Sequence, residues 1–252
     1  CRLTPPRERR GLERLNVTGP KELEGCSVEA TPHPLPGKDG VYRRYAVLAW
    51  GLALVSAEVA GIAASYLAYA RGFSPLLCGS VGDAVIVSTR FLALAYVVGA
   101  CGLDLPDVIY RPLPSRRGLA TLTAAILCVA LLDFIVALSA YGRYSPQLLD
   151  MGRFLGEGAL WAFPLKVAYY FSEVTAMNAM YLLASKGWAL RRGHLTSGTL
   201  FLILGWALPH MFTKSVLVAV YAIVLIAIFY IGYELTGSPL APVILWSVVL
   251  LV

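Results

Sequence analysis

Long apolar stretches dominate this chain, and a soluble core of its size could not bury them. Hydrophobic residues make up 58% of the 252 residues and charged residues only 14%, against roughly 25% charged in an ordinary soluble domain. A membrane-spanning helix uses about 20 apolar residues. Lipid offers backbone N–H and C=O groups no partners, which favours helices, and the alternating pattern of a barrel strand is absent. The sequence therefore predicts an all-α, polytopic bundle of transmembrane helices.

The apolar stretches are separated by turns and charged segments. They predict about seven spans, at residues 45–70, 81–101, 118–140, 158–184, 195–213, 215–233 and 239–252, with boundaries good to a few residues. Residues 1–44 instead hold nine Lys/Arg, six Asp/Glu and several prolines, with no sustained apolar period. We expect this segment to be a basic, Pro-rich, disordered tail and residues 45–252 to form the membrane domain.

Positive charges outside the spans gather on one side of the predicted bundle. Fifteen Lys/Arg fall on the side of the amino terminus and four on the opposite side. The positive-inside rule then places the amino terminus in the cytoplasm. The spans also make a nucleic-acid partner unattractive, despite the net charge of +6. The lipid bilayer is the expected partner.

Six ionisable residues fall well inside the predicted spans. They are Glu58, Arg90, Asp133, Lys166, Glu173 and His210. An unpaired charge in lipid costs several kcal/mol, so each of these side chains should face protein or water. One interpretation is structural: Arg90 would pair with Glu58 or Asp133, and the Lys166 side chain would extend toward the membrane surface.

Two of the six lie close to prolines. Pro164 precedes Glu173 by about two turns and is expected to break the helix there, and Pro209 directly precedes His210. Proline removes a backbone donor and bends a helix, which leaves room and free carbonyl groups nearby. Since two such groups in mid-membrane are best accommodated together, we expect Glu173 and His210 to face one interior cavity from adjacent helices.

Three short motifs follow one another in the second half of the chain. They read SEVTAMN at 172–178, GWALPH at 205–210 and YELTGSPLAP at 233–242. Over residues 155–252 this order resembles the CPBP family, also called ABI. These are intramembrane metalloproteases that include CAAX prenyl proteases and bacteriocin-processing relatives. Their pattern is a Glu-Glu-x-x-x-Arg helix, then Phe-x-x-x-His, then a His-x-x-x-Asn helix that follows Thr-Gly-Ser.

The resemblance implies a metal site built on acidic and imidazole side chains. Glu173 would be the general base and His210 a ligand to zinc or another divalent metal. A catalytic zinc normally has three protein ligands and one open position. Asp133, on the third predicted span, is a candidate for the missing ligand.

Other motif positions depart from the family. Asn178 stands where the family has Arg, and Trp206 stands where it has Phe. Trp246 and Leu250 replace the second His and the Asn, and an indole N–H can only donate, so it cannot bind a metal as imidazole does. We expect Asn178, Trp206 and Trp246 around the cavity. The resemblance thus implies either a weakly conserved metalloprotease or a non-catalytic relative that binds hydrophobic or lipidated peptides.

An alternative function needs no metal. A transporter or channel-like bundle would use a polar path through Glu58, Arg90, Asp133, Glu173 and His210. Convergence of all five on one cavity would favour this alternative, whereas a cluster of only Glu173, His210 and Asn178 would favour the protease family.

The Thr-Gly-Ser-Pro segment also predicts local structure. Ser238 is a favourable residue to cap a helix, and Pro239 suits the first helical position. Gly237 permits a tight turn before them. We therefore expect the sixth span to end here and the last span to begin at Ser238.

Overall fold

The computed structural model describes residues 40–112, 116–142, 161–188, 191–192, 195–213 and 215–251. The chain divides into two units, Cys1–His33 and Pro34–Val252, and all the described residues belong to the second. Most of the tail predicted at residues 1–44 lies outside the described residues, so its predicted disorder is left as a prediction.

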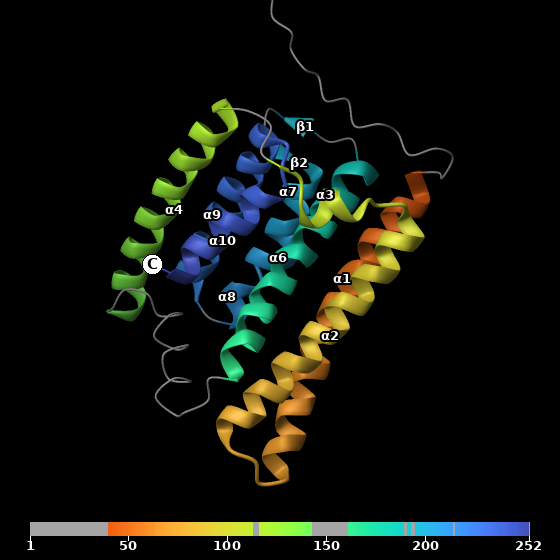
Figure 1. The fold of residues 1–252 in the computed structure, drawn as a ribbon, viewed down its shortest axis with the longest axis vertical. Coiled ribbons are helices and arrows are strands. Elements are labelled where there is room, and N and C mark those ends of the chain that lie inside the picture. Colours follow the sequence, from red (N-terminus) through yellow and green to blue (C-terminus); the bar gives the residue numbers. More distant parts are fainter. Residues whose placement is uncertain are drawn as a thin grey trace, which may run out of the picture. The chain divides into compact units, whose positions relative to one another are not determined.

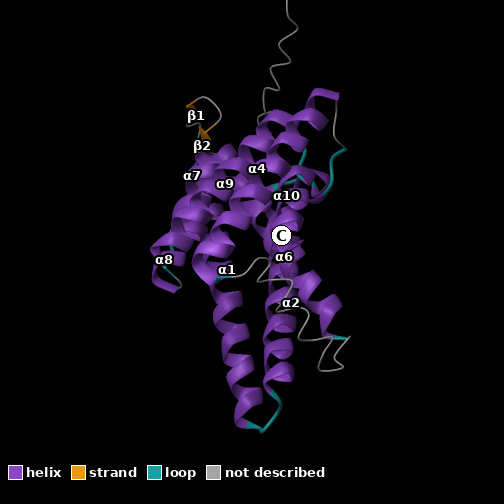
Figure 2. Cartoon of the chain, turned by 90° about the vertical axis from the view of Figure 1, so that its left-hand side faces the viewer, coloured by secondary structure: helices purple, strands orange, loops and turns teal. Residues whose placement is uncertain are grey.

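The described part of the chain is built almost entirely of helices, as predicted (Figure 2). The long ones are α1 (Gly40–Ala70), α2 (Pro75–Cys101), α4 (Arg116–Tyr141), α6 (Ala162–Gly187) and α9 (Val216–Thr236). Shorter pieces are α3 (Leu105–Ile109), α7 (Ser197–Leu202), the π-helix η1 (Ile203–Ala207), α8 (His210–Thr213) and α10 (Leu240–Leu251). Two antiparallel strands of two residues each, β1 (Arg191–Arg192) and β2 (Leu195–Thr196), precede α7.

Several helix ends follow directly from local sequence. The Ser74 hydroxyl accepts from Leu77 N at the start of α2, and the Ser215 hydroxyl accepts from Val218 N at the start of α9. Helices α2 and α9 both end at a glycine in the left-handed region, Gly102 and Gly237. These are the side-chain N-cap and the glycine C-cap that satisfy exposed helix ends.

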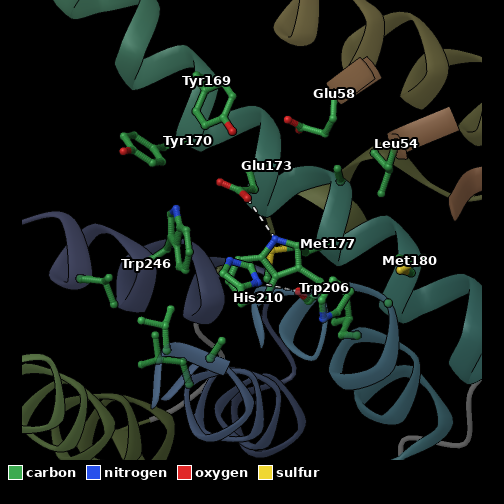
Figure 3. A pocket seen from close by; sticks show the side chains of 18 of the residues that line it. Leu54, Glu58, Tyr169, Tyr170, Glu173, Met177, Met180, Trp206, His210 and Trp246 are labelled. Carbon is green, nitrogen blue, oxygen red and sulfur yellow. Dashed lines mark hydrogen bonds between the residues drawn. The ribbon is translucent and has the colours of Figure 1, made fainter. Parts of the chain in front are cut away.

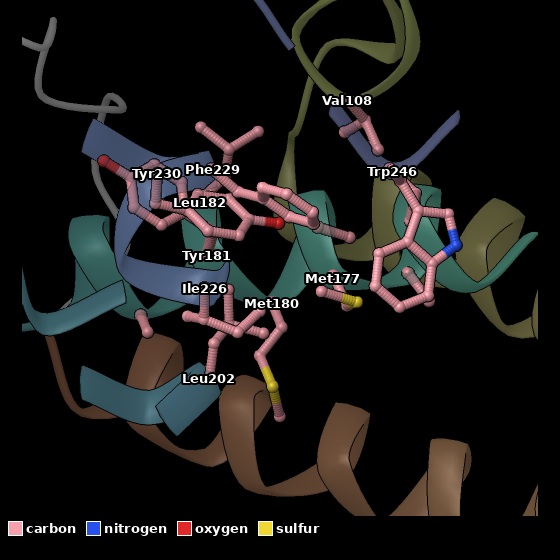
Figure 4. Packing of buried hydrophobic residues seen from close by; sticks show 14 of the residues in the cluster. Val108, Met177, Met180, Tyr181, Leu182, Leu202, Ile226, Phe229, Tyr230 and Trp246 are labelled. Atoms are coloured by element: carbon pink, nitrogen blue, oxygen red, sulfur yellow. The ribbon is translucent and has the colours of Figure 1, made fainter. Parts of the chain in front are cut away.

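Helix α6 lies at the centre of the described bundle. It packs against α1 and α2 on one side and against α7 and α10 on the other, while α4 packs on α9 and α10 (Figure 1). Every residue from Val174 to Ala184 is buried. A helix that is covered on all faces belongs to the core of a bundle. Tyr181 of this helix belongs to one apolar cluster with Ile226 and Phe229 of α9 (Figure 4).

Helices α1 and α2 form an antiparallel pair that is closely packed at two glycines. A Cβ atom on Gly82 would lie 2.9 Å from the Gly61 carbonyl oxygen and 2.1 Å from Ser65 Oγ. A Cβ on Gly61 would meet the Ile86 side chain at 2.3 Å. Only glycine allows the two backbones this approach, which is the usual role of small residues between membrane helices.

Among the described residues, four helices are long and apolar enough to cross a membrane, against the seven spans predicted for the chain. They are Val47–Ala70, Pro75–Cys101, Arg116–Ser139 and Val216–Thr236. Many large apolar side chains on α1, α2 and α4 are exposed, as expected for surfaces that face lipid. These observations indicate an integral membrane protein.

The other three predicted spans have different forms. The segment predicted at 158–184 is α6, which is long enough but is not among the four apolar spans. The segment at 195–213 is divided among α7, η1 and α8, with the chain turning at Pro209. Helix α10 has 12 residues, about 18 Å at 1.5 Å per residue, which is short of a hydrocarbon core of about 30 Å.

The two predicted helix breaks have different outcomes. Pro164 does not break α6, because it lies in the first turn, where its missing N–H would have no partner within the helix. The break before the last helix is confirmed: α9 ends at Thr236, and α10 begins at Leu240, two residues after Ser238. The Ser238 hydroxyl accepts from Leu240 N at 3.3 Å, as a capping residue does.

Candidate functional site

A cavity of about 660 Å³ lies within the bundle, lined by residues of α1, α2, α4, α6, α7, α8, α9 and α10 and of η1. All six ionisable residues predicted inside the spans line it: Glu58, Arg90, Asp133, Lys166, Glu173 and His210. In Figure 3, Glu58, Tyr169, Tyr170 and Glu173 lie around the same space as Trp206, His210 and Trp246. The expectation that Glu173 and His210 share one cavity is therefore confirmed.

The guanidinium of Arg90 is the most extensively bonded charge of the cavity. It forms an ion pair with Glu58, confirming one of the two predicted pairings. Its Nη1 also donates to the Tyr169 carbonyl oxygen at 3.3 Å and to Ser172 Oγ at 3.2 Å. Because Arg90 is only 6% exposed, these partners hold it in place and join α1, α2 and α6.

Lys166 forms a second ion pair beside the first. Its Nζ lies 3.1 Å from Asp83 Oδ2 on α2, so the predicted extension toward the membrane surface is replaced by a partner inside the bundle. Both cations lie close to the ring of Tyr169, whose centroid is 4.8 Å from Arg90 Cζ and 4.7 Å from Lys166 Nζ. Aromatic faces attract cations at such distances.

Glu173 and His210 are connected through Trp206. The Trp206 indole N–H donates to Glu173 Oε1 at 3.0 Å, and His210 Nδ1 donates to the Trp206 carbonyl oxygen at 2.8 Å. The Trp206 and His210 rings are 4.6 Å apart. Trp206 lies in η1, and π-helical turns are frequent at functional sites. In a neutral imidazole whose Nδ1 is the donor, Nε2 is the acceptor nitrogen.

Asp133 lines the cavity from helix α4. Its Oδ1 accepts a hydrogen bond from the Tyr221 hydroxyl of α9. Its Oδ2 is buried and has no hydrogen-bond partner among the described residues. The residue is 3% exposed, so this oxygen is an uncompensated acceptor beside the cavity.

The position of Trp246 agrees with its predicted place beside Glu173 and His210. The centroid of its ring lies 5.5 Å from the ring centroid of Trp206 and 5.8 Å from that of Phe229, and both pairs have the edge-to-face arrangement. Its indole N–H is buried and has no acceptor among the described residues. Leu250 also lines the cavity. Where the family has a second His and an Asn, this chain therefore presents apolar surface and one N–H donor.

Asn178 does not line the cavity, in contrast to its expected place at the rim. It is fully buried, and its amide donates to the carbonyl oxygens of Val108 and Pro239 at 3.0 and 3.3 Å. Its Oδ1 accepts from the Tyr230 hydroxyl at 3.0 Å. The residue thus connects α6 to the segments before α4 and α10. Its role there is structural.

The described residues bring no three His, Cys, Asp or Glu side chains together as ligands of a metal ion. Glu173 and His210 supply two of the three protein ligands that a catalytic zinc needs, and one Glu173 oxygen is already bonded to Trp206. The donor set that the resemblance implies is therefore incomplete within the described residues.

Comparison with known proteins gives no further assignment. No family model, no curated protein and no solved structure matches the chain.

Proposed function

We propose that this protein is an integral membrane carrier that takes a small polar molecule into the cavity between its helices. One observation carries the proposal: Glu58, Arg90, Asp133, Glu173 and His210 come from five helices and line the same cavity. Such groups are expensive in a membrane and are expected where they contact a substrate, an ion or water. Asn178, which the protease interpretation would add, is absent from the lining.

The dimensions and lining of the cavity support this function. Its volume of about 660 Å³ lies within the range of about 300–1,000 Å³ that is usual for small-molecule sites. Apolar walls such as Leu54, Met177 and Leu225 surround the polar groups. A few polar groups placed in an apolar cavity give a ligand both desolvation and orientation. We also propose a cytoplasmic amino terminus, on the charge asymmetry of the loops.

Cysteine accessibility in liposomes tests the carrier. Ala137→Cys places a thiol on the cavity wall, and Leu131→Cys on the same helix serves as a lipid-facing control, both in a background without native cysteines. A carrier should expose Ala137→Cys to a charged, membrane-impermeant methanethiosulfonate from either side of the membrane in turn. Leu131→Cys should react from neither side. Reaction of Ala137→Cys from one side only would identify a closed binding pocket and contradict transport.

A relative of the CPBP proteases is the second candidate, with zinc or another divalent metal as its cofactor. It is favoured by the shared cavity of Glu173 and His210 and by the turn at Gly237 before α10. Metal analysis of the purified protein and of the His210→Ala variant tests it. A stoichiometric metal that is lost in the variant, together with casein cleavage that is lost in Glu173→Gln, would replace the carrier with this candidate.

A further inference from the structure

We propose that the cavity selects an organic cation, a small amine or quaternary ammonium compound that carries one hydrogen-bond acceptor. This inference depends on the proposed function and names its substrate class. The cations of the cavity are paired within the bundle, whereas two of its carboxylates form no ion pair in the described part of the chain.

Both permanent cations of the cavity are already compensated. Arg90 is paired with Glu58, and Lys166 with Asp83. The Tyr169 ring lies against both cations as well. An anionic ligand would therefore have to separate an existing ion pair, and a group left alone in the membrane would then be costly. The geometry disfavours anions.

Two carboxylates of the cavity form no ion pair within the described residues. Within the described residues, Glu173 and Asp133 have no Lys, Arg or His nitrogen at ion-pair distance. Each accepts one hydrogen bond from a neutral donor, the Trp206 indole and the Tyr221 hydroxyl respectively. The buried Asp133 Oδ2 accepts none. A cation with N–H groups, or a quaternary ammonium held by charge alone, would compensate these carboxylates.

Aromatic rings complete the surroundings that such a cation prefers. Trp206, Trp246, Tyr170 and Tyr221 all line the cavity. Aromatic faces bind ammonium and quaternary ammonium groups through the ring quadrupole, most strongly when water is excluded. The chain already uses this interaction at Tyr169, which lies against Arg90 and Lys166. Carboxylates and aromatic rings together favour an organic cation over a bare metal ion.

A further buried group without a hydrogen-bond partner restricts the choice of ligand. The Trp246 indole N–H is buried beside the same cavity without an acceptor in the described part of the chain. A buried donor that stays unpaired costs free energy, and a hydroxyl or carbonyl oxygen on the ligand would satisfy it. An amino alcohol has both features: a cationic nitrogen for Asp133 and Glu173, and an oxygen for Trp246.

Calorimetric titration of the protein in nanodiscs with a matched series of ligands tests the inference. Choline and ethanolamine are the cations. The neutral analogue of choline, 3,3-dimethylbutan-1-ol, has the same shape without the charge, and 3,3-dimethylbutanoate supplies an anion. We expect a cation to bind at least about tenfold more tightly than the neutral analogue, which is what a desolvated cation–π contact alone provides. Asp133→Asn and Glu173→Gln should each remove most of this preference.

The matched control is Asp107→Asn, which changes a carboxylate of α3 that pairs with Arg111 outside the cavity. It should leave the affinity for the cation unchanged. Equal or tighter binding of the neutral or anionic analogue, or cation binding insensitive to both cavity variants, would overturn the cation assignment while retaining a ligand-binding cavity. If neither cation binds, the assignment is also wrong, and the accessibility of Ala137→Cys from both sides decides independently whether the carrier proposal survives.

Discussion

Helices α4 and α6 have the same length, 26 residues, but opposite surroundings. In α6 every residue from Val174 to Ala184 is buried, whereas only 17% of the most apolar stretch of α4 is buried. Nevertheless α4 meets the apolar requirement of a membrane span and α6 does not. Of these two helices, the more apolar one is the more exposed. The central helix can be less apolar because other helices satisfy its polar groups.

The largest expected difference in stability is between two variants that each shorten a leucine, one in α6 and one in α4. Leu183→Ala in α6 opens a void that neighbouring helices cannot fill, and should lower the free energy of unfolding by about 2–5 kcal/mol. Leu131, 61% exposed on α4, faces a fluid surface. Acyl chains fill the space left by Leu131→Ala, so its effect should stay within about 0.5 kcal/mol. Thermal unfolding in detergent measures both variants, and equal shifts would contradict the comparison.

Two glycines of α2 allow the same comparison of a packed and an exposed site, with a smaller expected change in stability. Gly82 packs against α1, and Gly79 has open space beside it. Gly82→Ala places a methyl group against Ser65 and the Gly61 backbone, and should destabilise the protein by about 1–3 kcal/mol through overpacking. Gly79→Ala, on the same helix, has nothing within 4 Å of the new methyl. It should be neutral or stabilising by up to about 1 kcal/mol, since alanine favours helix. The difference in unfolding midpoint should vanish only if α1 and α2 do not meet at these glycines.

Two serines of the last helical segment give the smallest effect. Ser238 caps α10 and its hydroxyl donates to the Arg111 carbonyl oxygen, so Ser238→Ala should cost about 1–2 kcal/mol. Ser247 bonds only within its own helix, to Val243. Ser247→Ala should therefore leave stability unchanged. A larger loss at Ser247 than at Ser238, seen in chemical denaturation, would show that the start of α10 is not anchored in this way.

Much of the helical framework could be predicted from local sequence. Apolar length predicted α1, α2, α4 and α9, and the Gly237–Ser238 turn marked the start of α10. The cost of charge in lipid predicted that Glu173 and His210 would share a cavity. Each of these follows from a rule that acts within one helix or on one side chain.

The unpredicted features depend on which helices are neighbours. Lys166 and Asp83 are separated by 83 positions, and no periodicity indicates that α6 lies beside α2. Asn178 bonds to backbone carbonyl groups of two connecting segments, and any residue type can supply these acceptors. The count of seven spans is not confirmed for a related reason, because apolar composition alone does not distinguish a lipid-facing helix from one enclosed by protein.

The glycine contact between α1 and α2 also fixes a register. Along α1, Glu58 lies three residues before Gly61, and along α2, Arg90 lies eight residues after Gly82. These spacings place each charge on the same helix face as its glycine. When the glycines meet, Glu58 and Arg90 come opposite one another. A slip of one helical turn would move the two charges apart by about 5.4 Å. Two residues without side chains thus determine which ions meet at the cavity wall.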